Sequence, residues 1–123
     1  MTRRLLPPAL LLAHLLPTTA LAQPPEADAR PFARALQRLV GQRQGPVMLS
    51  AVHAEGNVMV LTVNGAIGWR AFVPVERMSQ IQLARYCRRP EVRGFFNGRR
   101  LLRIDTTEMG RNRWPGALVS HCP

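Results

Sequence analysis

The side chains that could act as nucleophiles or general bases are few in this sequence of 123 residues. Beyond residue 22 there are two histidines, His53 and His121, and two cysteines, Cys87 and Cys122. A small envelope hydrolase could use either histidine together with a carboxylate, such as Asp105 or a glutamate. However, no G-x-S-x-G, H-E-x-x-H or glycine-rich phosphate loop surrounds these residues. The sequence therefore favours a protein that is not an enzyme, and the hydrolase is the alternative hypothesis.

The first 22 residues are typical of a secretory signal peptide. Arg3 and Arg4 precede an apolar run, Leu5–Leu16, and residues 20–22 form a small-x-small cleavage site. This run is too short to span a bilayer stably, and no later run of about 20 apolar residues exists. We expect cleavage near Ala22, no transmembrane span and a periplasmic or secreted location. The sequence leaves open whether the Sec or the twin-arginine pathway exports the chain.

Export decides how the two cysteines are interpreted. In an oxidising compartment a single pair of cysteines most simply forms one disulfide, so we expect Cys87 to pair with Cys122. Such a bond would tie the last predicted strand to the middle of the domain. The alternative is a metal site that adds His53 and His121, but C-x-x-C and H-x-x-x-H spacings are missing. We therefore expect no metal site and no cofactor.

Arginine is the source of a strongly basic charge. The sequence has 17 basic residues, all arginine, against 7 acids, for a net charge of +10. Loss of Arg3 and Arg4 with the signal peptide leaves 15 arginines and a net charge of +8. Nine arginines and three acids lie between residues 85 and 113, a local excess of +6. This excess has two explanations: a functional anion-binding surface, or a solvated face in a chain that uses arginine throughout.

Seven of these arginines make up the candidate anion-binding surface. They are Arg85, Arg88, Arg89, Arg93, Arg99, Arg100 and Arg103. Guanidinium groups bind phosphate, lipopolysaccharide, anionic lipid and acidic proteins. Nucleic acid is not an expected partner, because the chain is exported and aromatic residues are not interleaved with the arginines.

Apolar periodicity predicts helices and strands in alternating blocks. The predicted helices are 31–40, 74–86 and a short helical turn at 90–96, and the predicted strands are 47–54, 58–63, 100–106 and 114–122. Glu55-Gly56-Asn57 predicts a turn that joins strands 47–54 and 58–63 in a hairpin. Asn64-Gly65 predicts a second tight turn, and 66–73 is either a third strand or an extended crossover. In the first helix the predicted apolar stripe contains Phe32, Ala35, Leu36, Leu39 and Val40.

This order of elements favours an α+β fold in one domain. We expect the order α-β-β-α-β-β, with an antiparallel sheet of about four strands and two or three helices on one face. The domain would span residues 31–123 and contain one disulfide, and residues 23–30 would form a flexible lead-in.

The C-terminal half carries a pattern of cysteines and turn residues that resembles small exported bacterial proteins. The pattern comprises Leu83-Ala84-Arg85-Tyr86-Cys87, Pro90, Phe95-Phe96-Asn97-Gly98, Gly110 and Cys122. It is similar to the quorum-sensing-regulated virulence factor family and to the non-lipidated part of some type II secretion pilotins. The resemblance implies an α+β domain in which a helix cysteine pairs with a C-terminal cysteine, and it implies no catalytic residues.

These observations together predict a small exported protein that acts by binding. We expect a non-enzymatic binding or accessory protein whose partner is another protein or an anionic envelope component.

Overall fold

The computed structural model describes residues 24–123, so the predicted signal peptide lies outside the described residues. Its β-strands are β1 (Arg43–Gln44), β2 (Val47–Glu55), β3 (Val58–Gly65), β4 (Leu101–Glu108) and β5 (Arg111–Trp114). Its α-helices are α1 (Arg30–Leu36), α2 (Val75–Tyr86) and α3 (Pro90–Phe95). Short 3-10 helices occur at Pro25–Ala27, Gln37–Leu39 and Trp69–Ala71. The described region is therefore an α+β domain, as predicted.

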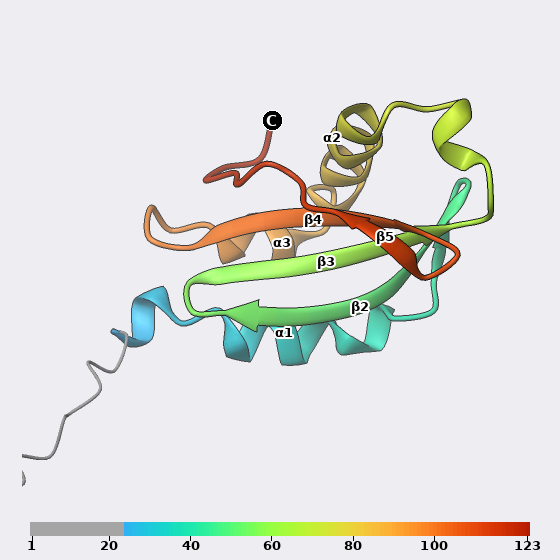
Figure 1. Cartoon of the computed structure of the whole chain (residues 1–123). Coiled ribbons are helices and arrows are strands. Elements are labelled where there is room, and N and C mark those ends of the chain that lie inside the picture. The colour runs from blue at the N-terminus through green and yellow to red at the C-terminus, as the bar shows by residue number, and fades with distance from the viewer. Residues whose placement is uncertain (1–23) are drawn as a thin grey trace, which may run out of the picture.

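The five strands form one mixed sheet in the order β1-β2-β3-β4-β5 (Figure 1). Strands β3 and β4 are parallel, and the other neighbouring pairs are antiparallel. The prediction of an antiparallel sheet of about four strands is wrong in the number of strands and in the direction of one pair. The reason is the connection through residues 66–100, which carries the chain back across the sheet so that β4 runs in the same direction as β3.

The hairpin of β2 and β3 agrees with the prediction, but its second strand is longer than expected. The predicted turn at Asn64-Gly65 is wrong, because β3 continues through Gly65. Asn64 is held by β4 and the turn beyond it, since its side-chain oxygen accepts hydrogen bonds from Thr107 Oγ1 at 2.9 Å and Gly110 N at 2.7 Å. Of the two structures predicted for 66–73, a third strand or a crossover, the chain forms the crossover, which contains the 3-10 helix Trp69–Ala71.

The last strand lies earlier than the sequence predicted. Strand β5 occupies Arg111–Trp114, so only Trp114 falls within the predicted strand 114–122, and Pro115 follows β5. Met109 and Gly110 both have positive φ angles, 50° and 71°, and form the tight turn between β4 and β5. The predicted strand 114–122 is therefore wrong: beyond β5 the chain makes one antiparallel bridge, between Val119 and Leu102.

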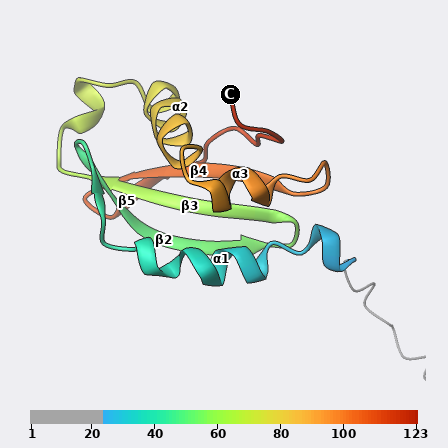
Figure 2. The same ribbon diagram turned by 180° about the vertical axis from the view of Figure 1, so that it is seen from behind.

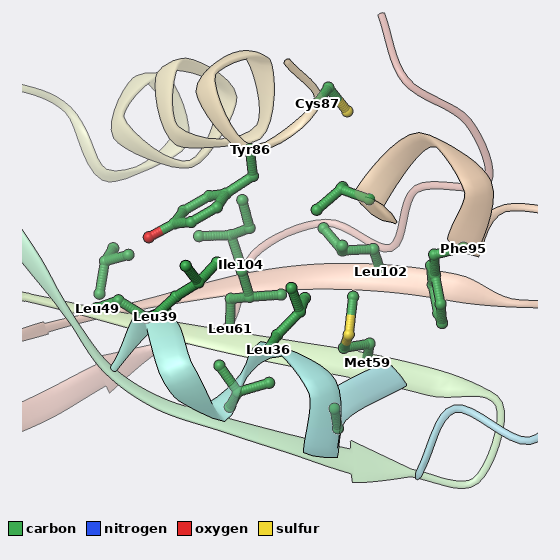
Figure 3. Close-up of a cluster of buried hydrophobic side chains, with 14 of the residues drawn as sticks. Leu36, Leu39, Leu49, Met59, Leu61, Tyr86, Cys87, Phe95, Leu102 and Ile104 are labelled. Carbon is green, nitrogen blue, oxygen red and sulfur yellow. The ribbon is translucent and has the colours of Figure 1, made fainter. Parts of the chain in front are cut away.

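The helices α1, α2 and α3 lie on the same face of the sheet, as Figures 1 and 2 show from opposite sides. The core between helices and sheet combines side chains from both layers (Figure 3). It includes Leu36, Leu39, Leu49, Met59, Leu61, Tyr86, Phe95, Leu102 and Ile104, each 3% exposed or less. Burial of this cluster supplies the main driving force for folding.

The predicted apolar stripe of the first helix is partly wrong. Ala35 and Val40 are exposed, whereas Ala33 is buried together with Leu36 and Leu39. The α-helical part ends at Leu36 and continues as a 3-10 turn, which has about three residues per turn. Val40 follows this turn in an extended conformation, so it is not part of the helical stripe.

The segment that precedes α1 contacts the rest of the domain. Ala29 is buried, and its N–H donates to the carbonyl oxygen of Gly56 at 3.1 Å. The side-chain amide of Asn97 donates to the carbonyl oxygen of Glu26 at 2.7 Å. Among the helices of residues 24–123, none is long and apolar enough to cross a membrane.

Candidate functional site

An apolar groove lies between α2 and the chain that follows β5. Its volume is about 220 Å³. The residues that line it are Glu76, Ser79, Gln80, Leu83, Leu102, Ile104, Trp114, Gly116, Ala117 and Val119. Helix α2 forms one wall, the face of β4 forms the floor, and the C-terminal segment, residues 115–123, forms the second wall with Trp114. We refer to this site as the groove.

The C-terminal segment is fixed at the edge of β4 by its backbone. Leu102 and Val119 exchange two backbone hydrogen bonds, each 2.9 Å long. The N–H of Gly116 donates to Oδ1 of Asp105 at 3.1 Å. The second wall of the groove is therefore held in place although it is not part of a regular strand.

The predicted disulfide between Cys87 and Cys122 is confirmed and joins the two walls. Its sulfur atoms are 2.12 Å apart, and the two Cα atoms are 5.8 Å apart. Cys87 directly follows α2 and Cys122 lies in the C-terminal segment, so the bond fixes their separation. Because both sulfurs are bonded, neither cysteine acts as a thiolate nucleophile or metal ligand in this state. Residues 24–123 contain no group of three metal-ligand side chains that could hold an ion.

The two histidines lie away from the groove. Nε2 of His53 is 3.0 Å from Oε1 of Glu55, and the two side chains are 40% and 48% exposed. This hydrogen bond lowers the pKa of Glu55, with Arg103 adding to the effect. His121 is exposed and pairs with the hydroxyl of Ser120 at 3.1 Å. His53 and Glu55 supply the histidine and carboxylate of the hydrolase hypothesis, but the pair is exposed, and among residues 24–123 no nucleophile bonds to His53 and no carboxylate bonds to His121. The hydrolase hypothesis therefore gains no direct support.

Asp105, the other candidate acid, is buried in an ion network on the sheet face that the helices leave open. Its carboxylate is 0% exposed and accepts hydrogen bonds from Arg103 Nε at 2.7 Å and Arg103 Nη2 at 2.9 Å. Arg113 Nη1 donates to it at 3.2 Å. The bond to Asp105 raises the pKa of the Arg103 guanidinium. Asp105 therefore orders β4, Arg113 and the C-terminal segment.

Arg100 is used inside the domain. Its guanidinium carbon lies 4.1 Å from the ring centre of Phe32 and 5.3 Å from that of Phe95. It also donates to the carbonyl oxygens of Phe95, Gly94 and Glu26, and the residue is only 9% exposed. Cation–π contacts and buried charge-assisted hydrogen bonds are the features of a structural arginine.

The other predicted anion-binding residues fall into two groups. Arg99 pairs with Glu26 at 3.5 Å, and Arg93 donates to the carbonyl oxygen of Cys87 at 3.4 Å. Arg85, Arg88 and Arg89 line a separate polar hollow at the end of α2. The structure thus disperses the seven arginines over several surfaces and brings three of them together.

The groove was not predicted from the sequence. Trp114 is 45% exposed and lies at the rim. The sequence signal that could have located the groove is Pro115-Gly116 directly after a strand residue. This pair ends β5 and lets the chain turn out of the line of that strand and pack against β4.

The fold and groove define a small disulfide-bonded α+β domain with one mixed sheet. No protein-family model matches the sequence, and no curated protein matches it significantly. Among solved structures, the fold is similar to that of the pilotin EpsS from the type 2 secretion system of Vibrio vulnificus. The TM-score is 0.62 at 15% identity, over 75% of this chain and 84% of that chain. The pilotin resemblance is therefore supported at the level of the fold, and the quorum-sensing-regulated family gains no support.

Proposed function

We propose that this protein is a non-enzymatic accessory protein of the bacterial envelope that binds a protein partner in the groove. The observation that carries the proposal is the similarity of fold to a type 2 secretion pilotin over three quarters of the chain. The Cys87–Cys122 disulfide supports an oxidising compartment, such as the periplasm. The groove supplies an apolar surface for binding, whereas neither His53 nor His121 of the hydrolase hypothesis lines it.

The dimensions of the groove favour a protein partner over a small-molecule ligand. Sites for small molecules usually enclose about 300–1,000 Å³. The groove, at about 220 Å³, is smaller, and its surface is mostly apolar. It has room for a few anchoring side chains of a helix or extended segment, which is how apolar grooves recognise peptides. Trp114 at its rim is of the residue type that most often dominates such interfaces.

The first candidate partner is a component of a type II secretion assembly, with a secretin as the protein to test. The test uses the full chain, expressed with its signal peptide and a tag in its own host. Wild type and a Trp114→Ala variant are captured from solubilised envelopes, and the amount of secretin that co-purifies is measured by mass spectrometry. We expect Trp114→Ala to lower the captured secretin by about tenfold or more, because hot-spot truncations cost about 2 kcal/mol or more.

Phe72→Ala is the matched control for this experiment. Phe72 is also an exposed aromatic residue, at 87%, but it does not line the groove. We expect Phe72→Ala to capture as much secretin as wild type. The proposal is wrong if wild type captures no secretin, or if both aromatic variants lose binding equally.

A further inference from the structure

Three arginines converge on one hollow at the junction of α2 and α3, which we call the arginine hollow. It is lined by Gln44, Arg85, Arg88, Arg89, Pro90 and Glu91, and its volume is about 460 Å³. Arg85 lies in the last turn of α2, and Arg88 and Arg89 lie in the short connection to α3, so chain ends from both helices bring the three side chains to one hollow. Gln44 of β1 also lines the hollow.

The guanidinium groups of the arginine hollow have unused donors. Among the described residues, the guanidinium groups of Arg85 and Arg88 have no hydrogen-bond or ion-pair partner, although their backbones bond to each other. Arg89 donates through Nη2 to Gln42 Oε1 at 3.3 Å, and its Nη1 lies 3.9 Å from Glu91 Oε1. Each guanidinium carries five N–H donors, so most of the donors of these three residues are free to bind an anion.

The position of Arg85 is set by the tight turn before β2. A Cβ atom on Gly45 would lie 2.8 Å from Arg85 Nη1, so the guanidinium packs directly over the bare glycine. Gly45 has a φ of +64°, a backbone conformation that glycine adopts without strain. Arg85 is therefore a half-buried cation held against the wall of the hollow.

The charge of the arginine hollow is not balanced from within. Glu91 is the acid that lines it, and Glu91 already forms an ion pair with Arg38 in addition to its contact with Arg89. Three guanidinium groups that line one hollow repel one another, because like charges at short range raise the electrostatic energy. A bound anion would remove this repulsion, whereas Arg100 and Arg103 have internal partners and gain nothing from one.

We propose that the arginine hollow binds an oxyanion of the phosphate class, either a phosphorylated headgroup or free phosphate. The planar fork of arginine donates two parallel hydrogen bonds to phosphate oxygens, and three such forks meet here. The volume exceeds what one phosphate needs and leaves room for the group that carries it. This site is separate from the groove, so the inference does not depend on the proposed function.

The test compares two variants that lose the same positive charge. The first variant, Arg85→Gln/Arg88→Gln/Arg89→Gln, removes the three charges of the arginine hollow. The second variant, Arg34→Gln/Arg77→Gln/Arg111→Gln, removes three exposed arginines elsewhere. Binding of inorganic phosphate is measured by NMR titration. Binding to vesicles of phosphatidylcholine, with and without phosphatidic acid, is measured by sedimentation. We expect the hollow variant to bind at least about tenfold more weakly than wild type and the matched variant to stay within about twofold.

The two probes distinguish the source of the phosphate group. If inorganic phosphate binds and also displaces the protein from vesicles, the site recognises the phosphate group itself. If the protein binds only to vesicles, the site recognises a phosphorylated headgroup. The inference is overturned if wild type binds neither probe, or if both triple variants lose binding equally. Arg88→Gln, at an exposed position, is a second variant that cannot fail through misfolding, and we expect a smaller loss in the same direction. Trp114→Ala should leave phosphate binding unchanged, which separates this site from the groove.

Discussion

Gly116 lies against the backbone of Ile104, so closely that a Cβ atom at residue 116 would clash with the Ile104 carbonyl oxygen. This contact lets the chain after β5 return to the edge of β4 and form a wall of the groove. The N–H of Gly116 also reaches Asp105 at 3.1 Å, which a displaced backbone would lose. The groove therefore depends on a residue without a side chain.

Gly116→Ala should destabilise the domain and alter the groove. The obstacle is backbone rather than a flexible side chain, so the segment must move, at a cost of about 1–3 kcal/mol. The measurement is the free energy of unfolding in urea. Gly94→Ala is the control, since a Cβ there meets nothing within 4 Å and alanine favours a helix by about 1 kcal/mol over glycine. Equal stability of the two variants would show that the contact with Ile104 is unimportant.

Reduction of the Cys87–Cys122 bond should lower the thermal stability substantially. The two cysteines are 35 residues apart, and closing such a loop contributes about 4 kcal/mol in the chain-entropy model. We expect Tm to fall by more than about 10 °C when reductant is added, measured by circular dichroism. The Cys87→Ser/Cys122→Ser variant should have the lower Tm from the start and should not respond to reductant. A reductant-insensitive wild type would contradict the prediction.

Several elements of the fold were predictable because their signals are local. The β2–β3 hairpin follows from β-branched residues on both sides of Glu55-Gly56-Asn57. Helix α2 follows from the proline that precedes Val75 and from apolar residues at helical spacing. The disulfide follows from export and the presence of a single pair of cysteines.

The elements that were not predictable depend on contacts between distant residues. The parallel pairing of β3 with β4 requires knowledge of where the 66–100 connection returns, which no local pattern contains. Strand β5 consists of four exposed residues and has no apolar alternation. The groove combines α2, β4 and the C-terminal segment, and the roles of the arginines depend on which aromatic rings and carboxylates fold beside them.

Arg100 should be more important for stability than any other arginine of the predicted anion-binding set. Arg100→Lys keeps the charge but loses the planar group that contacts the rings of Phe32 and Phe95, and it loses part of the hydrogen bonds. We expect a loss of about 1–3 kcal/mol in the free energy of unfolding. Arg99→Lys is the control, because Arg99 is 59% exposed and pairs only with Glu26 at the surface. The assignment fails if the two lysine variants are equally stable.

The hydrogen bond between His53 and Glu55 should be visible in the titration of the carboxylate. It holds the pKa of Glu55 below its ordinary value of 4.5, and Arg103 also lowers this pKa. A depressed pKa in the folded state means that the ionised carboxylate stabilises the fold above about pH 4.5. This contribution disappears as the pH falls through the lowered pKa.

Carbon-detected NMR titration of His53→Ala should show the pKa of Glu55 rising toward 4.5, although not fully because Arg103 remains. His121→Ala, whose ring contacts Ser120 instead, should leave the pKa of Glu55 unchanged. If His53→Ala leaves that pKa at its wild-type value, the lowering comes from the arginine alone and the histidine has no electrostatic role on this face.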